Sequence, residues 1–371
     1  MRLILWIGIA QSILFLGHGL LYRTLVSFYG VADPVKLWTL RVSLALLSIS
    51  FIGSSLLSSR FANLWVRALY ILSASWLGLS YLLFLASALG WILHGLKPLF
   101  PFPLNRKAMI TLLFGIALAG GLYGFINASV IRIQTIDLPL PHLPAVWEGR
   151  KAVWVSDLHL GHVRHRGFAQ RLTEILRHPN PDIVFIGGDL FDGAKAMDLS
   201  QTVAPFLRLR PPLGTYFITG NHEEFGDRTP FLEAVRSAGI RVLDNEKMEI
   251  DGLQILGVGY RDSRNQKQFQ AMLRKMEIDP KKPSLLLKHV PSDLEIAREQ
   301  GISAQLSGHT HRGQVFLFRF LTSWIYKGYD YGLKRYGDLL VYTSSGVGTW
   351  GPPLRIDSEP EIVVIQFKRR N

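Results

Sequence analysis

Aspartate, asparagine and histidine residues follow five short apolar segments in the second half of the chain. Carboxylates, imidazoles and amide oxygens are side-chain groups that bind divalent cations. A pair of such cations needs a bridging carboxylate and several further nitrogen and oxygen ligands. The chain has no cysteine, so thiolate ligands and cysteine nucleophiles are excluded. The candidate ligands are Asp157, His159, Asp189, Asn221, His289, His309 and His311.

The apolar segments before these residues predict β-strands of an α/β domain. Strand ends of one sheet meet at one edge, where α/β proteins bind ligands, so we expect the seven side chains to share one pocket. Gly188, Gly220 and Gly308 precede three of the ligands, as tight turns or a close backbone approach require. The predicted strands are 152–156, 182–187, 215–219, 253–258, 284–288, 303–306, 339–343 and 361–367, and the predicted helices are 167–177, 229–238, 265–276 and 292–299.

Each of these residues, taken alone, has a structural interpretation. An aspartate after a strand is often a helix cap, and a single histidine is often a surface or core residue. The set of seven, in this order and after five separate strands, favours a metal centre instead.

Four apolar runs occupy the chain before residue 128, at 3–22, 37–57, 64–93 and 108–126. Each is long enough to cross a bilayer as a helix. A signal peptide is an alternative for the first run only, and no small-residue cleavage site follows it. Buried helices of a soluble protein are a second alternative, but such helices carry a polar stripe that these runs lack. We expect a transmembrane region over 1–128, a linker with the first strand over 129–150, and a second domain over 151–371.

Charge bears on the partners and on the orientation of the chain. A formal net charge of +13 and a pI near 9.9 favour anionic partners, which include phospholipid headgroups, phosphorylated substrates and nucleic acid. The positive-inside rule compares basic residues on the two sides of the predicted spans. It predicts that both termini lie outside the cytoplasm. The comparison sets Arg23, Lys36, Arg41, Lys97, Arg106 and Lys107 against Arg2, Arg60, Arg67 and Arg132.

Polar residues within the apolar runs have two interpretations. Gln11, His18 and Arg67 could mark a transport path. Hydrogen bonding between helices, or extension of a long side chain toward the interface, is the commoner role and the one we expect.

Five sequence blocks carry a resemblance to a known family. The blocks are DLHLG at 157, GDLFD at 188, GNHE at 220, KHVP at 288 and GHTH at 308. Together they resemble the calcineurin-like metallophosphoesterase superfamily over most of residues 150–368. The segments GHTHRGQ at 308, SSGVGTWGPPLRI at 344 and EIVVI at 361 resemble its membrane-associated bacterial branch. Arg312 stands where that branch usually has glycine. The resemblance implies a four-layer αββα sandwich of two mixed sheets after the four transmembrane helices.

The resemblance also implies roles for the candidate residues. Asp157, His159 and His311 are expected to hold one metal, Asn221, His289 and His309 the other, and Asp189 to bridge them. The metals are expected to be two divalent ions, manganese, iron or zinc. His222 matches the family's general acid or transition-state stabiliser, and Asp192 is placed to orient its ring. The implied reaction is in-line attack on phosphorus by a hydroxide held between the metals.

The substrate is less constrained by the sequence. Pyrophosphohydrolases of UDP-diacylglucosamine share the implied fold and a GDLF-like block, but they resemble GNRD where this chain has GNHE, so that substrate is disfavoured. Aromatic and basic residues interleave over 316–335, which suits a membrane interface or a lipid headgroup pocket, or alternatively a structural hairpin. His162 and Arg312 are candidate substrate-binding residues. The basic turn that contains His162, Arg164, His165 and Arg166 could contact phosphate or be solvated.

These observations predict a membrane-anchored phosphomonoesterase or phosphodiesterase that acts on a membrane or envelope phosphate compound. Its expected partners are the lipid bilayer and a phosphorylated small molecule or lipid, with no nucleic acid. One alternative is a metal-binding sensor or scaffold without turnover, which would have no use for His222 and Asp192. The other is a nuclease of the same superfamily, which the positive charge suggests and membrane tethering disfavours.

Overall fold

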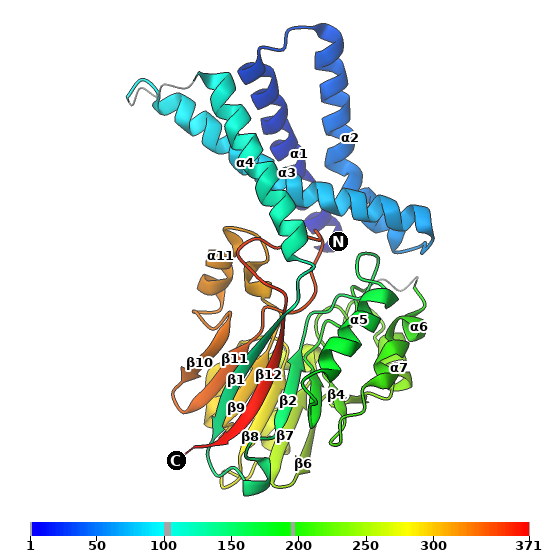
Figure 1. Ribbon diagram of the computed structural model, residues 1–371, viewed down its shortest axis with the longest axis vertical. Helices are drawn as coiled ribbons and strands as arrows, with labels where there is room; N and C mark the ends of the chain where they lie inside the picture. Colours follow the sequence, from blue (N-terminus) through cyan, green and yellow to red (C-terminus); the bar gives the residue numbers. More distant parts are fainter. Residues whose placement is uncertain (1, 100–104, 194–196, 371) are drawn as a thin grey trace. The chain divides into compact units, whose positions relative to one another are not determined.

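The computed structural model describes residues 2–99, 105–193 and 197–370 (Figure 1). The chain divides into two compact units. The helix unit comprises Met1–Asn127 and Gly351–Ile356, and the sheet unit comprises Ala128–Trp350 and Asp357–Asn371. Each unit is described by itself.

The helix unit contains four long apolar helices, each long and apolar enough to cross a membrane. They correspond to the four apolar runs of the sequence and extend them at one or both ends. Three helices begin at a side-chain cap, because Asp33 accepts the Lys36 N–H, Asn63 the Val66 N–H and Asn105 the Ala108 N–H. The helices are α1 (Arg2–Tyr29), α2 (Pro34–Ser58), α3 (Leu64–Leu96) and α4 (Arg106–Asn127).

Hydrogen bonds between helices connect α1 to its neighbours. The Gln11 side-chain amide donates to the Ser48 carbonyl of α2 at 3.1 Å. The Trp76 indole N–H of α3 donates to His18 Nε2 at 2.9 Å. Gln11 and His18 therefore link helices, as predicted.

The segment Gly351–Ile356 packs within the helix unit, although it is far from the helices in sequence. A Cβ added at Gly78 would lie 2.3 Å from Leu354 Cδ2, so the glycine makes room for the leucine. The Arg355 N–H donates to the Gly124 carbonyl at 2.9 Å, and the Asn127 side chain donates to the Arg355 carbonyl at 3.1 Å. The sequence did not indicate this association.

The sheet unit contains two mixed sheets of six strands each. The strand order is β1-β12-β2-β3-β4-β5 in the first sheet and β10-β11-β9-β8-β7-β6 in the second. The strands are β1 (Arg132–Leu140), β2 (Lys151–Val155), β3 (Ile183–Ile186), β4 (Thr215–Phe217), β5 (Arg241–Val242), β6 (Glu246–Ile250), β7 (Leu253–Val258), β8 (Ser284–Lys288), β9 (Ala304–Ser307), β10 (Gly332–Tyr336), β11 (Leu339–Thr343) and β12 (Glu361–Arg369).

The buried side chains define four layers. Trp154 and Phe185 of the first sheet share one apolar core with Leu285 and Leu306 of the second, so the two sheets pack face to face. A second core lies between the first sheet and helices α5 and α7, and a third between the second sheet and helices α9 and α10. This arrangement confirms the predicted αββα sandwich. The helices of this unit are α5 (Arg166–Arg177), α6 (Leu199–Val203), α7 (Thr229–Ser237), α8 (Tyr260–Ser263), α9 (Gln266–Lys275), α10 (Leu294–Glu299) and α11 (Phe318–Ile325), with 3₁₀ turns η1 (Ala145–Trp147), η2 (Ala204–Arg208) and η3 (His311–Gly313).

Parallel pairing brings the candidate ligands to one edge of each sheet. Strands β2, β3 and β4 are parallel neighbours, and so are β8 and β9. Each candidate ligand follows the carboxyl end of one of these strands by one to four residues. The direction of the strands, rather than any single turn, therefore gathers the site.

The aromatic and basic segment 316–335 differs from a simple hairpin. A helix, α11, occupies Phe318–Ile325, and only the following strand β10 pairs antiparallel with β11. The hairpin interpretation is therefore wrong for the first half of this segment.

Candidate metal centre

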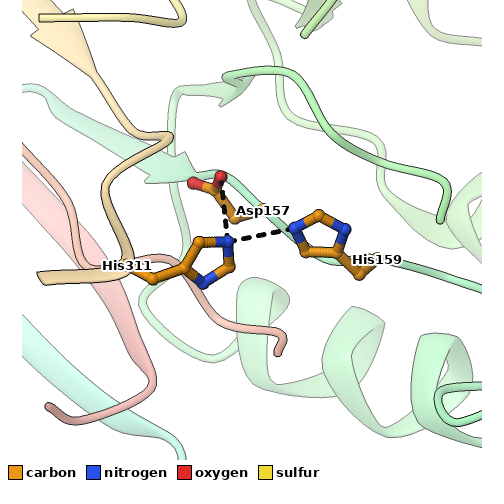
Figure 2. Close-up of side chains that lie close together, drawn as sticks. All are labelled: Asp157, His159 and His311. Carbon is orange, nitrogen blue, oxygen red and sulfur yellow. Dashed lines mark hydrogen bonds and ion pairs between the residues drawn. The ribbon is translucent and has the colours of Figure 1, made fainter. Parts of the chain in front are cut away.

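The first cluster of candidate ligands consists of Asp157, His159 and His311. His311 Nε2 lies 3.6 Å from Asp157 Oδ1 and 3.0 Å from His159 Nε2. Figure 2 shows the three side chains pointing toward one common point, Asp157 and His159 from the loop after β2 and His311 from the loop after β9. Two imidazole nitrogens this close must share a proton or a cation, since two lone pairs or two N–H groups would repel.

The second cluster consists of Asp189, His289 and His309. His289 Nε2 lies 3.3 Å from Asp189 Oδ2, and the rings of His289 and His309 have centroids 5.1 Å apart. The other nitrogen of His289, Nδ1, lies 2.7 Å from the Gly187 carbonyl. This contact orients the ring so that Nε2 faces the cluster.

Asp189 lies beside both clusters. Its Oδ2 atom is 3.3 Å from His289 Nε2 and 3.9 Å from His159 Nε2, which belong to different clusters. Its Oδ1 atom accepts the His222 backbone N–H at 2.9 Å. One carboxylate is therefore held where it can serve two cations.

The backbone at the ligands adopts an uncommon conformation. Left-handed φ values are rare for non-glycine residues and persist where surrounding structure enforces them, often at functional sites. At this site they occur at Asp157 (56°), His159 (49°), Asp189 (51°), His309 (72°) and His311 (48°).

Close approach explains the glycines that precede three of the ligands. A Cβ added at Gly308 would lie 2.4 Å from Asp157 Oδ2, and one at Gly220 would lie 2.2 Å from Asp189 Oδ1. A Cβ at Gly188 would lie 2.7 Å from His289 Nδ1. Any larger residue at these positions would displace a candidate ligand.

The charged groups of the site shift one another's pKa values. Burial opposes ionisation of Asp189, but the surrounding histidines, His289 first, hold the pKa of its carboxyl well below the ordinary range. Burial likewise opposes the charged form of His289, but the Asp189 carboxylate outweighs burial and raises the pKa of His289 to about 9. Burial, reinforced by His289, lowers the pKa of His309 to about 3. The protein thus offers a buried carboxylate that requires positive charge nearby.

The residues fit a pair of divalent cations. Asn221 Oδ1 is buried and accepts no hydrogen bond from the described residues, which is costly unless another group satisfies it. The paired Nε2 atoms of His159 and His311 lie 3.0 Å apart, where a shared proton or a cation can satisfy both. The donor set contains nitrogen and oxygen without sulfur, which suits ions such as Mn²⁺, Fe²⁺ and Zn²⁺.

His222 and Asp192 lie beside the two clusters. His222 Nε2 is 4.0 Å from Asp189 Oδ2, and burial lowers the pKa of its imidazole. Asp192 Oδ1 is 3.9 Å from His222 Nδ1 and 3.4 Å from His159 Nδ1. Asp192 therefore lies closer to His159, a candidate metal ligand, than to His222, whose ring we predicted it to orient.

The candidate substrate-binding residues lie in different settings. His162 and Arg164 are buried, and Arg164 donates to the Ala128 carbonyl at 2.8 Å, so the solvated-turn interpretation is wrong for these two residues. Arg312 lies directly after His311, with its guanidinium 4.3 Å from the centre of the Tyr331 ring. Only Arg312 is both adjacent to a candidate ligand and partly exposed.

Glu223 is a buried residue whose role the sequence did not assign. Its Oε2 atom accepts the N–H groups of Asp189 at 3.0 Å and Gly220 at 2.8 Å, and Oε1 accepts the Phe191 N–H at 3.0 Å. It thereby joins the loop after β3 to the loop after β4. The available signal was a glutamate directly following His222, between apolar strands, where burial requires partners.

The chain is similar to a known protein family and to several individual proteins. The model of the family described as calcineurin-like phosphoesterase matches residues 150–313. A metallophosphoesterase of Helicobacter pylori is 30% identical over 276 residues, which cover 72% of this chain and 74% of that protein. A metallophosphoesterase of Aquifex aeolicus is 34% identical over 262 residues, which cover 68% and 98%. A Danio rerio protein named transmembrane protein with metallophosphoesterase domain is 31% identical over 287 residues, which cover 71% and 63%. The chain belongs to the calcineurin-like phosphoesterase family of metal-dependent phosphoric ester hydrolases.

Proposed function

We propose that this protein is a membrane-anchored, two-metal phosphoesterase that cleaves phosphomonoester or phosphodiester bonds of a membrane or envelope compound. The observation that carries the proposal is the position of Asp189, whose Oδ2 atom faces His289 of one cluster and His159 of the other. A carboxylate between two groups of nitrogen and oxygen donors is what a two-metal site requires.

Each cluster is assigned one cation. Asp157, His159 and His311 hold the first, Asn221, His289 and His309 hold the second, and Asp189 bridges them. When bound, two divalent cations activate water and neutralise charge on phosphoryl oxygens. The protein's own contribution is to fix the ligands rigidly, through left-handed backbone at five of them and through Glu223, which joins two of the ligand loops.

His222 is assigned the role of general acid. Its Nε2 atom is on the side of Asp189, and Asp192 lies near its Nδ1 atom. A protonated imidazole in this position would donate a proton to the leaving alkoxide. Arg312, partly exposed beside His311, is assigned to the phosphate or to a neighbouring anionic group of the substrate.

The four apolar helices are assigned to the membrane as a multi-pass anchor. The relative from Danio rerio, whose name describes a transmembrane protein, supports this assignment. The distribution of basic residues beside the spans favours an extracytoplasmic sheet unit. A substrate that resides in the membrane or envelope would suit an enzyme tethered in this way.

Phosphate release tests the proposal. Detergent-purified full-length protein is incubated with Mn²⁺ and fractionated envelope lipids or nucleotides, beside Asp189→Asn and the control Asp338→Asn, which changes an exposed carboxylate. Wild type and the control should bind two metals per chain and release phosphate, EDTA should abolish release, and Asp189→Asn should lose it. Wild-type protein that binds no metal, or that hydrolyses none of these substrates, would overturn the proposal.

A further inference from the structure

Helix α11 and the residues just before it expose an unusual set of apolar side chains. Trp324 is 78% exposed and Phe320 is 58% exposed. No residue of the helix is buried. We call this set the α11 patch; it consists of Phe316, Leu317, Phe318, Phe320, Leu321, Trp324 and Ile325. A contiguous apolar surface of this kind usually marks a site of contact with a protein or a membrane.

Polar residues of α11 attach the helix to the sheet unit. Arg319 forms an ion pair of 2.7 Å with Asp357, and the Thr322 hydroxyl donates to Asp330 at 3.2 Å. A helix of a soluble domain normally has the opposite arrangement, with its apolar face against the core. Figure 1 shows α11 outside the two sheets, at the end of the second sheet near β10 and β11.

Positive charge accompanies the α11 patch. Lys327, two residues after the end of the helix, is exposed, and so are Lys334 and Arg335 of strand β10. Exposed tryptophan and phenylalanine with nearby lysine and arginine form the composition of segments that lie in a bilayer interface, with cations at the headgroups. An apolar protein partner would have no need of these cations, whereas anionic headgroups complement them.

A cavity lies at the end of this patch. It has a volume of about 430 Å³, and Ile325, Tyr326 and Lys327 line it opposite Asp293 and Gln266. The Tyr326 ring lies 6.2 Å, centroid to centroid, from the ring of His309. One residue of the cavity lining, Tyr326, is therefore a neighbour of a candidate ligand.

We propose that α11 is an interfacial helix, which inserts the α11 patch into the surface of a bilayer that carries anionic headgroups. The sheet unit then has a membrane contact of its own, separate from the four apolar helices. If the proposed function also holds, this contact favours phosphate esters that reside in the bilayer over those dissolved in water.

The absence of cysteine allows a direct test in the full-length protein. Single variants Phe320→Cys and Trp324→Cys carry a nitroxide label, and Leu207→Cys is the control, because Leu207 is an apolar residue of η2 that is 48% exposed. The protein is reconstituted in vesicles of phosphatidylcholine, with or without phosphatidylglycerol. Collision of the label with oxygen, relative to a water-soluble nickel complex, reports its depth in the bilayer.

The expected oxygen-to-nickel ratio is several-fold higher at positions 320 and 324 than at 207, and highest with phosphatidylglycerol. Equal ratios at all three positions would overturn the proposal, and so would spin–spin broadening at 320 or 324, which would indicate a second copy of the chain. If the oxygen-to-nickel ratio at 320 and 324 were the same with and without phosphatidylglycerol, the proposed role of the anionic headgroups would be wrong. This readout does not depend on catalysis, so an inactive enzyme would refute the proposed function and leave the interfacial helix standing.

Activity provides a second measurement. The double variant Phe320→Ser/Trp324→Ser should hydrolyse p-nitrophenyl phosphate within about twofold of wild type, because aromatic insertion serves only the bilayer contact. Its rate on the most active lipid fraction should fall several-fold. An equal loss on both substrates, or no loss on either, would contradict the proposed preference for bilayer-resident esters.

Discussion

Buried polar side chains have different surroundings in the helix unit and in the metal centre. Thr24 and His18, buried among apolar helices, each accept an indole N–H at 2.9 Å, from Trp91 and Trp76 respectively. In the metal centre, Asn221 Oδ1 has no such partner among the described residues. The hydrogen bonds of Thr24 and His18 are supplied by the fold, whereas Asn221 in the metal centre requires a partner from outside the protein, such as a cation.

The contrast does not rest on unpaired atoms alone. In the described helices, Ser87 Oγ and His94 Nδ1 also lack hydrogen-bond partners. Neither belongs to any of the groups of three potential metal ligands found in the described part of the chain. Asp189 and His159 each belong to two such groups, because they also form a third group with His222. A functional site is distinguished here by several charged or unpaired groups that lie close together, and not by a single unpaired polar atom.

Removal of a cluster ligand should have the largest effect on bound metal and on activity. His311→Ala deletes the nitrogen 3.0 Å from His159 Nε2. We expect the bound metal to fall from two ions per chain to one and phosphatase activity to fall by about 10³-fold, because charge stabilisation at phosphorus is lost. Elemental analysis and phosphate release measure the two effects.

The matched control is His178→Ala, which removes an exposed histidine after α5. It should retain both metals and full activity. If His311→Ala kept two metals, the first cluster would not be a cation site.

The sequence predicted the grouping of the ligands because each follows a strand, and parallel strands bring their carboxyl ends together. Asp157 and His311 are 3.6 Å apart in the structure although 153 residues separate them in the chain. Spacing and residue type were sufficient for this inference, since the chemistry of the ligands requires specific side chains.

Prediction from the sequence failed for features that depend on backbone groups and tertiary packing, and not on the chemistry of a side chain. Glu223 acts on backbone N–H groups of other loops, and such groups leave no mark in the sequence. The segment Gly351–Ile356 is neither long nor strongly apolar, so its packing in the helix unit follows from tertiary fit at Gly78 and Gly124. Helix α11 was missed although its apolar residues recur at helical spacing, because eight residues of aromatic and basic character suit a strand of a hairpin as well as a short helix.

Glu223 is buried and accepts hydrogen bonds within the fold, like the polar groups of the helix unit, yet it lies beside the candidate ligands. In Glu223→Gln, the new amide N–H₂ group would face backbone N–H donors, which disturbs the loops that carry Asp189 and Asn221. We expect metal affinity and activity to fall by about 10- to 100-fold, as for partners that support metal ligands. Titration with Mn²⁺ against activity measures the affinity, and Glu174→Gln, at an exposed residue of α5, is the control. Unchanged affinity would mean that Glu223 only stabilises the fold.

Glu361 is a buried carboxylate outside the two clusters, and its partners make it resemble the helix-unit groups. It accepts the Ser345 N–H at 3.0 Å and the hydroxyls of Tyr331 and Tyr342 at 3.2 Å. Burial nonetheless raises the pKa of Glu361 above its ordinary value near 4.5, against the effect of these donors. The folded protein therefore binds this proton more tightly than the unfolded chain. Its contribution to stability is present below the ordinary pKa and is lost as pH rises through the raised one.

Glu361→Gln cannot titrate at this position. The free energy of unfolding of the variant, minus that of wild type, should therefore increase as pH rises through that window, by about 1.4 kcal/mol for each unit of the pKa shift. Unfolding is followed in detergent with EDTA, so that metal release does not contribute to either protein. A difference that is constant with pH would show that Glu361 keeps an ordinary pKa.

The smallest expected effect belongs to the helix unit. Thr24→Val preserves the shape of the side chain and removes the hydroxyl that accepts the Trp91 indole N–H. Hydrogen bonds between membrane helices contribute only about 0.6 kcal/mol on average, because the unfolded state within the membrane also finds partners. We expect a loss of this size in detergent unfolding, with bound metal and phosphatase activity unchanged. A loss of metal in Thr24→Val would show that the helix unit and the metal centre are energetically coupled, and the division between structural and functional polar groups would then fail.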